Sequence, residues 1–190
     1  DFTWRDVQNA LIESAMPVGE DDPDWTENGA GYRINHQFGF GRLDAESLMQ
    51  VAENLPLLPA EVTLTDLNES LLPIPDYGAA GDEDARSTIL VEEDIEVESV
   101  EVSITVSHRR RGQLGIEIIS PDNTVSKLYL PHAIDRNPDI NWTFTSMRCW
   151  GESSRGIWTL RIYDNERGIV GNLTSWVLNI HGHRRSNIGQ

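Results

Sequence analysis

Few residues in this sequence have the type and setting that chemistry requires. Cys149 is the only cysteine, so it can form neither an internal disulfide nor a cysteine-based metal site. A catalytic thiol would need a base beside it; between Arg148 and Trp150, in a run that predicts a strand, we expect a packed thiol. His36 adjoins a glycine-rich stretch, but no acid is placed to orient it and no nucleophile lies nearby. We interpret His36 as structural and assign no catalytic residue.

Two further patterns concern metal ions and glycans. Asp22 and Asp24 alternate as calcium ligands do, but no glycine follows at the sixth position and no glutamate at the twelfth, so the metal ligands stay unknown. Asn68, Asn141 and Asn172 each begin a glycosylation sequon, which is used only in a eukaryotic secretory route. We expect Asn68 to be the most accessible of the three and Asn141 the least, because Asn141 adjoins a tryptophan that we predict to be buried.

The charge of the chain is strongly divided. Residues 1–107 contain 24 acids and 4 arginines, a net charge of −20, whereas residues 108–190 contain 7 acids and 11 basic residues, a net charge of +4. An acidic surface of this size repels nucleic acid and anionic membranes, and we expect neither as a partner. It could attract cations or basic peptides, although a solvated surface is the simpler interpretation. No apolar run approaches the length of a membrane span.

Two amphipathic helices are predicted near the start of the chain. The first begins at a capping box formed by Thr3 and Asp6 and ends at Pro17, and its apolar residues recur at helical spacing: Trp4, Val7, Leu11 and Ala15. The second begins at Asp44, a good N-cap, and has an apolar face: Leu48, Val51 and Leu55. Two such helices cannot complete a core alone, so another surface must cover them.

After about Ser87 the pattern changes to short alternating runs separated by turn residues. Strict alternation of apolar and polar residues begins at Val100, and similar runs continue as far as His181. About seven short strands without a helical pattern indicate an antiparallel β-sandwich. Large rings bury much apolar surface, so we expect a core that contains Trp142, Trp158 and Trp176. As an alternative, exposed tryptophans could form a carbohydrate platform.

The connections between these elements can also be predicted. Residues 56–86 are interpreted as a linker, partly packed through its leucines. Arg109–Gly112 and Ser120–Thr124 are predicted as hairpin turns. The Phe-Gly-Phe-Gly stretch at 38–41 suits a strand or bend that is pressed against another backbone.

Five stretches, in this order, resemble the kexin/furin-like proprotein convertases of the subtilisin superfamily: FTWRDVQNALIESA, INHQFGFGRLDAESLMQVA, VSHRRRGQLGIEIISPDNTVSKL, NWTFTSMRCWGESSRGIWTLRIYD and GNLTSWVLNIHG. The resemblance implies the C-terminal helices of a subtilisin-like α/β peptidase domain, followed by a P (Homo B) domain, an antiparallel jelly-roll β-sandwich. The implied division is 1–55 for the peptidase part, 56–86 for the linker, 87–183 for the P domain and 184–190 for a tail.

The resemblance also carries expectations about function. The family comprises calcium-dependent serine endopeptidases that cut after paired basic residues, using an Asp/His/Ser triad and an oxyanion-hole Asn. None of these four matches a residue of this chain, so the chain alone should be inactive, and most calcium sites should lie outside it. Gln113 stands where the family usually has Asp, which puts one loop interaction in doubt. The implied partners are the rest of the catalytic domain and basic peptide or proprotein substrates.

Two hypotheses follow for the whole molecule. The first is the C-terminal region of a secreted or secretory-pathway endopeptidase, whose P domain stabilises the catalytic domain. The second is a non-catalytic P-domain module used for adhesion, assembly or carbohydrate binding. The absence of an initiating methionine leads us to expect a fragment or a processed product, and the Arg184–Arg185 pair is a candidate processing point.

Overall fold

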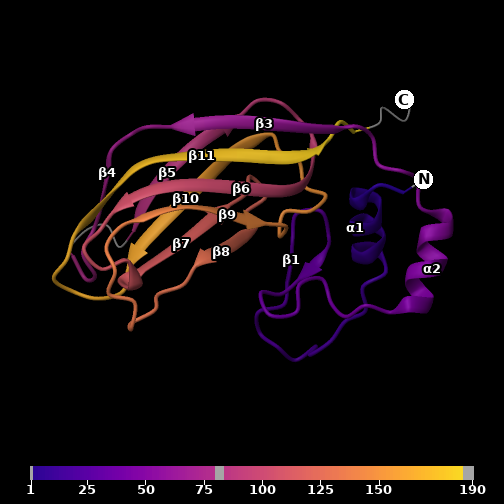
Figure 1. Cartoon of the computed structure of the whole chain (residues 1–190), viewed down its shortest axis with the longest axis horizontal. Helices are drawn as coiled ribbons and strands as arrows, with labels where there is room; N and C mark the ends of the chain where they lie inside the picture. Colours follow the sequence, from indigo (N-terminus) through magenta and orange to yellow (C-terminus); the bar gives the residue numbers. More distant parts are fainter. Residues whose placement is uncertain (1, 80–83, 186–190) are drawn as a thin grey trace.

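The computed structural model describes residues 2–79 and 84–185. Two helices and a small β-ribbon lie at one end of a β-sandwich (Figure 1). The prediction of a mainly β fold, an antiparallel sandwich preceded by helices, is confirmed. In the described ranges no helix has the length and apolar character needed to cross a bilayer.

The elements follow one another along the chain with short connections. The first part contains α1 (Trp4–Glu13), β1 (Thr26–Glu27), β2 (Arg33–Ile34) and α2 (Ala45–Asn54). The sandwich contains β3 (Glu61–Asn68), β4 (Leu72–Ile74), β5 (Ala85–Val91), β6 (Glu96–Ser107), β7 (Leu114–Ile119), β8 (Val125–Tyr129), β9 (Ile140–Ser146), β10 (Gly156–Asp164) and β11 (Gly171–His183), with a 3-10 turn at Arg111–Gln113.

The sandwich consists of two antiparallel sheets. One has five strands, in the order β3-β11-β6-β9, with β4 also paired to β11; the other has four, in the order β5-β10-β7-β8. Strands β8 and β9 are therefore edge strands, and they lie close to each other on one side of the sandwich.

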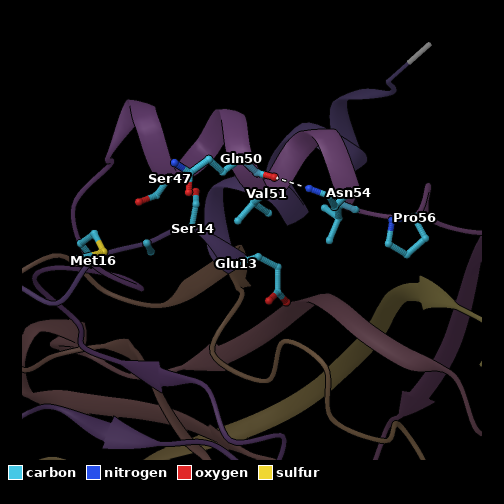
Figure 2. A pocket seen from close by; sticks show the side chains of 10 residues that line it. Glu13, Ser14, Met16, Ser47, Gln50, Val51, Asn54 and Pro56 are labelled. Carbon is cyan, nitrogen blue, oxygen red and sulfur yellow. Dashed lines mark hydrogen bonds between the residues drawn. The ribbon is translucent and has the colours of Figure 1, made fainter.

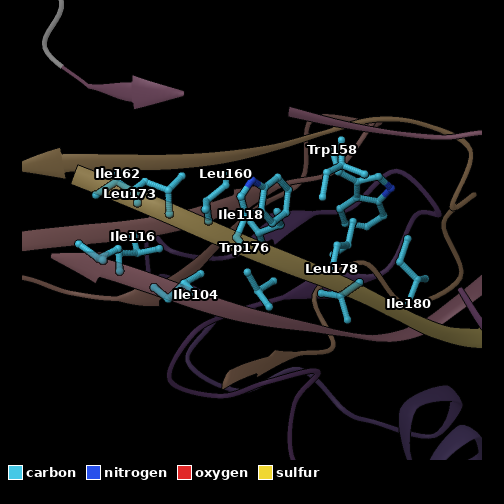
Figure 3. Close-up of a cluster of buried hydrophobic side chains, with 14 of the residues drawn as sticks. Ile104, Ile116, Ile118, Trp158, Leu160, Ile162, Leu173, Trp176, Leu178 and Ile180 are labelled. Atoms are coloured by element: carbon cyan, nitrogen blue, oxygen red, sulfur yellow. The ribbon is translucent and has the colours of Figure 1, made fainter. Parts of the chain in front are cut away.

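The core fills the space between the two sheets, as the alternating pattern predicts. In β6, β10 and β11 the inward residues are buried and the outward residues are largely exposed or half-buried. The rings of Trp158 and Trp176 lie fully inside, side by side with isoleucine and leucine side chains of both sheets (Figure 3). Each indole N–H has a partner, the carbonyl of Ser154 at 2.8 Å and the hydroxyl of Ser87 at 2.9 Å. The rings are thus buried without an unsatisfied donor.

The prediction that Trp142 belongs to this core is wrong. The side chain of Trp142 is 65% exposed. In the ladder it lies directly opposite Ile104, which is buried, so its inward direction was predicted correctly. However, β9 is the edge of its sheet, and the neighbouring edge strand β8 does not cover the ring. The position at an open edge, rather than the side-chain parity, exposes this tryptophan.

The prediction of a linker over residues 56–86 is also wrong for much of its length. β3 pairs with β11 along its whole length, and β4 adds a second, shorter pairing to the same strand. Only Leu64 of β3 is buried. Because backbone pairing rather than a strong apolar pattern defines these strands, the composition of the segment conceals them.

The two predicted turns have different outcomes. Ser120–Thr124 connects the antiparallel pair β7 and β8, and Asn123 has the positive φ of 68° that such tight turns require. The prediction of a hairpin at Arg109–Gly112 is wrong, because this segment leads from β6 in one sheet to β7 in the other.

The local signals in the helical part are confirmed. The hydroxyl of Thr3 accepts a hydrogen bond from the Asp6 N–H, and the carboxylate of Asp6 accepts one from the Thr3 N–H, which forms the capping box. Asp44 caps α2 by accepting from the Ser47 N–H at 2.9 Å. At Gly41, with φ of 135°, a Cβ would lie 2.4 Å from the carbonyl oxygen of Met16, so this close backbone approach requires glycine.

Candidate functional site: an apolar helical face fixed to the sandwich

Helix α1 exposes the apolar face that the sequence predicts to be covered. Three of its apolar side chains are exposed, as is Phe2 just before its N-cap: Phe2 47%, Trp4 69%, Val7 47% and Leu11 39%. The opposite face of α1 is buried and contains Arg5, Asp6, Ala10 and Ile12. Contiguous exposed apolar side chains of this size mark interaction surfaces in soluble proteins. We call these four residues the α1 face.

Helix α2 packs beside α1 and is itself poorly covered, since none of its residues is buried. Met49, on its outer side, is 63% exposed. Between the two helices lies a shallow hollow of about 550 Å³, lined by residues that include Glu13, Met16, Gln50 and Val51 (Figure 2). The helical pair therefore offers both an apolar ridge and a neighbouring depression.

A buried ion pair fixes α1 to the sandwich. The Arg5 guanidinium donates to both oxygens of Glu98, through Nε at 2.8 Å and through Nη2, and its Nη1 donates to the Pro59 carbonyl at 2.9 Å. His183, at the end of β11, approaches the same carboxylate with Nδ1 at 2.8 Å. Burial alone raises the pKa of Glu98, but Arg5 and His183 outweigh it and lower the pKa below its ordinary value. We call Arg5, Glu98 and His183 the helix joint.

Asp6 strengthens the same connection from the next position of α1. Its second oxygen accepts a hydrogen bond from the Leu58 N–H at 2.7 Å. The hydrogen bonds from Thr3 and from the Leu58 backbone lower the pKa of Asp6. One carboxylate thus caps the helix and also fixes the chain that leads into β3.

A second polar cluster attaches the β1–β2 region to β8. The carboxylate of Asp24 contacts His36 Nδ1 at 2.7 Å and accepts from Lys127 Nζ at 2.7 Å, and His36 Nε2 accepts from the Lys127 backbone N–H at 3.1 Å. Arg148 lies beside the same ring nitrogen, with its Nη1 3.1 Å from Nδ1. We call these four residues the loop latch. The expectation that no acid orients His36 is wrong, because Asp24 orients it, but the interpretation of His36 as structural agrees with this network.

The environment of the loop latch shifts its pKa values in defined directions. Burial lowers the pKa of His36, and the neighbouring Arg148 and Lys127 add to this effect although Asp24 opposes it. Burial raises the pKa of Asp24, but hydrogen bonds from Lys127 and His36 reverse the effect and lower the pKa well below its ordinary value. His36 is therefore held neutral and Asp24 ionised.

Asp22 and Asp24, the candidate calcium ligands, use their carboxylate oxygens in contacts with other residues of the chain. Asp22 accepts from the Asp24 N–H at 2.8 Å and from Asn35 Nδ2 at 3.0 Å, while Asp24 is paired with Lys127. Within residues 2–79 and 84–185 no three His, Cys, Asp or Glu side chains are grouped so that they could hold a metal ion. The donors that the sequence suggested do not fit a calcium ion.

No catalytic arrangement is found in the described part of the chain. Cys149 is buried in a turn rather than in the predicted strand, and burial raises its pKa well above the ordinary value, which makes the thiol unreactive. No serine hydroxyl of residues 2–79 and 84–185 donates to a histidine. The assignment of no catalytic residue stays an expectation about the whole chain.

Gln113 retains a contact in the loop where the resemblance put one in doubt. Its amide Nε2 donates to Glu166 at 2.8 Å, and its side chain is buried. Close by, His108 and Asp164 are buried with Nε2 and Oδ2 3.4 Å apart. Burial raises the pKa of Asp164. The β6–β7 connection is therefore tied to the end of β10 in this chain.

The three sequon asparagines differ in accessibility, and not as expected. Asn141 is exposed on edge strand β9, next to the exposed Trp142. Asn68 is half-buried, and its amide donates to the Thr88 carbonyl at 3.0 Å. Asn172 is half-buried within β11, between its partners in β6 and β4. The expected order of accessibility is thus reversed for Asn68 and Asn141.

Sequence reasoning missed the residues that attach the two parts of the molecule. Besides Arg5 and Glu98, the buried Asn28 donates from Nδ2 to the carbonyls of Arg148 and Trp150 at 3.0 and 2.9 Å. The adjacent Gly29 N–H donates to Glu152 at 2.8 Å. These partners are far apart in sequence, so no local pattern links them.

Comparisons with known proteins give the family. Residues 97–180 match the model of the proprotein convertase P-domain. The chain is 32% identical over 198 residues to proprotein convertase subtilisin/kexin type 6 of Rattus norvegicus, covering 95% of this chain and 20% of the relative. It is 35% identical over 177 residues to PC3-like endoprotease variant B of Hydra vulgaris, covering 86% of this chain and 24% of the relative. The chain thus spans only about a fifth of these relatives.

A solved structure has the same fold. It is the serine protease of Aeromonas sobria, determined with its chaperone, which superposes with a TM-score of 0.88 and 23% identity over 97% of this chain and 41% of the other. At this identity the likeness concerns the fold alone. The sequence matches alone show that the chain is homologous to proprotein convertases over 95% of its length and that its sandwich belongs to the proprotein convertase P-domain family.

Proposed function

We propose that the chain is the C-terminal region of a kexin/furin-like serine endopeptidase that processes proproteins after basic residues. In this proposal the sandwich stabilises the catalytic domain, and the α1 face is the surface that packs against it. The relatives are named as convertases and endoproteases, and the match extends over the helices as well as the sandwich. The activity would belong to the whole enzyme.

The exposed α1 face is the observation that carries this proposal. A free-standing module gains nothing from exposing Phe2, Trp4, Val7 and Leu11 together on one helix. The helix joint and the loop latch hold this helix in a fixed place on the sandwich. A rigidly presented apolar surface is what docking against a second folded body requires.

The same proposal carries expectations for calcium and for location. The enzyme would depend on calcium, and the ligands would lie outside the described residues, because Asp22 and Asp24 are committed to protein partners. The protein would be secreted or pass through the secretory pathway.

The α1 face is tested by the double variant Trp4→Glu/Val7→Glu in the full-length enzyme. Placing two carboxylates in a buried contact should lower the release of active enzyme by about tenfold or more, since each unpaired buried charge costs more than 1.4 kcal/mol. The measurement is hydrolysis of a fluorogenic dibasic peptide. In the isolated 190-residue chain the same variant should leave the melting temperature nearly unchanged, because both side chains are exposed.

Trp142→Ala is the matched control, because it removes an equally exposed tryptophan from the sandwich edge. It should leave the activity of the full-length enzyme unchanged. Full activity of the Trp4→Glu/Val7→Glu enzyme would contradict the proposal. Turnover of the dibasic peptide by the isolated chain would contradict the expectation that the chain lacks the catalytic machinery.

The alternative, a non-catalytic module for adhesion, assembly or carbohydrate binding, is favoured by one observation. Trp142 is exposed on an edge strand of the sandwich, where it has no role in the core. The two candidates differ in the behaviour of the isolated chain. A stand-alone module should be monodisperse at high concentration, whereas a docking fragment with an uncovered α1 face should self-associate or bind a dye specific for apolar surfaces.

A further inference from the structure

An aromatic groove lies at the open side of the sandwich, far from the α1 face. It has a volume of about 240 Å³ and is lined by Arg111, Tyr129, Ile140, Asn141, Trp142 and Phe144. The rings of Tyr129 and Phe144 lie 6.2 Å apart at a tilt of 56°. Trp142 is 65% exposed at the rim. We call these six residues the edge groove.

The polar groups around the edge groove are fixed in place. Arg111 Nε donates to Asp135 at 2.8 Å, and Asp135 also accepts from the backbone N–H and the amide of Asn137 at 3.0 and 2.9 Å. These partners, with Arg111 as the largest influence, lower the pKa of Asp135. Asn141 is exposed, and its side-chain amide forms no hydrogen bond with the described residues. The groove therefore offers a prepositioned guanidinium and an uncommitted amide beside aromatic rings.

Two loops that adjoin the groove at Arg111 contain further arginines. The loops at 108–113 and 130–139 are joined by backbone hydrogen bonds from Arg111 to Asn137 at 2.9 Å and from His132 to Gly112 at 2.7 Å. Arg109, Arg110 and Arg136 are exposed in these loops, and within the described ranges they form no ion pair. In a protein with a net charge of −16, such a group of uncompensated arginines is a local exception.

The combination of rings and free arginines defines the ligand. An exposed indole presents a flat apolar face on which the C–H face of a sugar ring can stack, and Asn141 can pair with its hydroxyl groups. The arginines select a carboxylate. A cationic ligand is disfavoured by Arg111 in the groove itself.

We propose that the edge groove binds a saccharide that carries a uronic acid carboxylate. One sugar ring stacks on Trp142, and its carboxylate pairs with the arginines of the two loops. This site is independent of the α1 face and of the proposed peptidase. It gives the sandwich a surface that recognises a glycan while its other end is occupied by a docking partner.

The test is a titration of the 190-residue chain with two matched probes. Hyaluronan hexasaccharide contains alternating uronic acids, and chitohexaose is a neutral chain of N-acetylated sugars. Calorimetry at a fixed, near-physiological ionic strength should show binding of the hyaluronan probe, with chitohexaose bound about tenfold more weakly. Binding should weaken as salt is added.

Variants separate stacking from charge. Trp142→Ala should weaken binding of the hyaluronan probe about tenfold, whereas Trp4→Ala, which removes a tryptophan of similar exposure on α1, should have no effect. Arg109→Ser/Arg136→Ser should weaken binding of the hyaluronan probe but not of chitohexaose. Arg155→Ser, at the opposite end of β10 from the loops, is the charge control. All four variants change exposed side chains, so thermal unfolding should be nearly unchanged and confirms that each is folded.

Three outcomes would overturn the proposal. The first is an absence of hyaluronan binding by the folded wild-type chain. The second is binding that Trp142→Ala leaves unchanged. The third is equally tight binding of hexaglutamate, which would show that the arginines recognise an acidic peptide or charge alone. None of these results would bear on the α1 face, because that surface is tested by the activity of the Trp4→Glu/Val7→Glu enzyme and not by glycan binding.

Discussion

The helical part and the sandwich of this chain differ in the solvent exposure of their tryptophans. Trp158 and Trp176 lie in a closed core between two sheets, with their indole N–H groups satisfied. Trp4 lies on the surface of α1 among other exposed apolar side chains. The sandwich thus obtains its stability from packing, whereas the helical part is held mainly by polar contacts to the sandwich. We therefore expect the sandwich to fold without the helical part, and the helical part to depend on the sandwich.

The strongest test of this contrast is Trp158→Ala. Removing a fully buried ring leaves a cavity in the core, and we expect the free energy of unfolding to fall by about 3–5 kcal/mol. Chemical denaturation followed by far-ultraviolet circular dichroism measures the change. A loss below about 1 kcal/mol would mean that the sandwich does not depend on this packing.

The next effect concerns the helix joint. Glu98→Gln removes the charge that pairs with the buried Arg5, and leaving a buried charge unpaired costs about 3 kcal/mol. We expect hydrogen exchange to show α1 opening while β6 and β11 remain protected. Arg86→Ala removes an exposed ion pair with Asp84 and serves as the control with little effect. Equal loss of protection in the whole sandwich would refute the separation into two regions.

A smaller effect is expected from acid at the loop latch. The pKa of His36 is lowered in the folded chain, so the neutral ring stabilises the fold above the unfolded pKa of about 6.5, and this contribution is lost as the pH falls below that value. Protonation would also remove the acceptor for the Lys127 N–H and place a cation beside Arg148. Protection of residues 24–36 against hydrogen exchange, corrected for the intrinsic rate at each pH, should therefore decrease from pH 7 to pH 5.

His36→Gln supplies the control for this pH effect. The variant cannot titrate at this position, so the loss of protection specific to residues 24–36 should disappear even if the loop opens somewhat more at neutral pH. Asp24 does not account for the effect, because its lowered pKa keeps it ionised throughout this range. If the variant retains the full pH dependence, another group controls the loop.

The smallest effect is expected from Trp4→Ala in the isolated chain. Because this side chain is 69% exposed, the free energy of unfolding should change by less than about 0.5 kcal/mol. The loss in the free energy of unfolding should thus be several-fold smaller for Trp4→Ala than for Trp158→Ala, although both replace a tryptophan by alanine. A loss comparable to that of Trp158→Ala would show that α1 is covered by contacts not seen in the described chain.

The sequence predicts those parts of the fold that depend on local patterns. The capping box at Thr3 and the alternation in β6, β10 and β11 are local, and both are confirmed. Trp142 shows the limit, because parity predicts which way a side chain points but not whether its strand lies at an edge. β3 was missed for a related reason, since its place depends on pairing with β11 and not on its own composition.

The attachment of the helical part could not be predicted at all. Arg5 and Glu98 are 93 positions apart, and Asn28 is 120 positions from Arg148. Glu98 does interrupt a run of valines at a buried position, which marks it as unusual, but nothing local identifies its partner. Asp24 and His36 are only 12 positions apart, yet their pairing depends on the fold of the intervening ribbon.

Glu98 also connects the first helix and the last strand through a single carboxylate. Because His183 of β11 and Arg5 of α1 share it, the integrity of the C-terminal strand bears directly on how firmly the opening helix is anchored. A processing enzyme that cuts after Arg185 would leave the helix joint intact. An exopeptidase that removed His183 would delete one of the three residues of the helix joint. The length of the C-terminal tail would then determine how firmly α1 is attached to the sandwich, and with it how firmly the α1 face holds a docked domain.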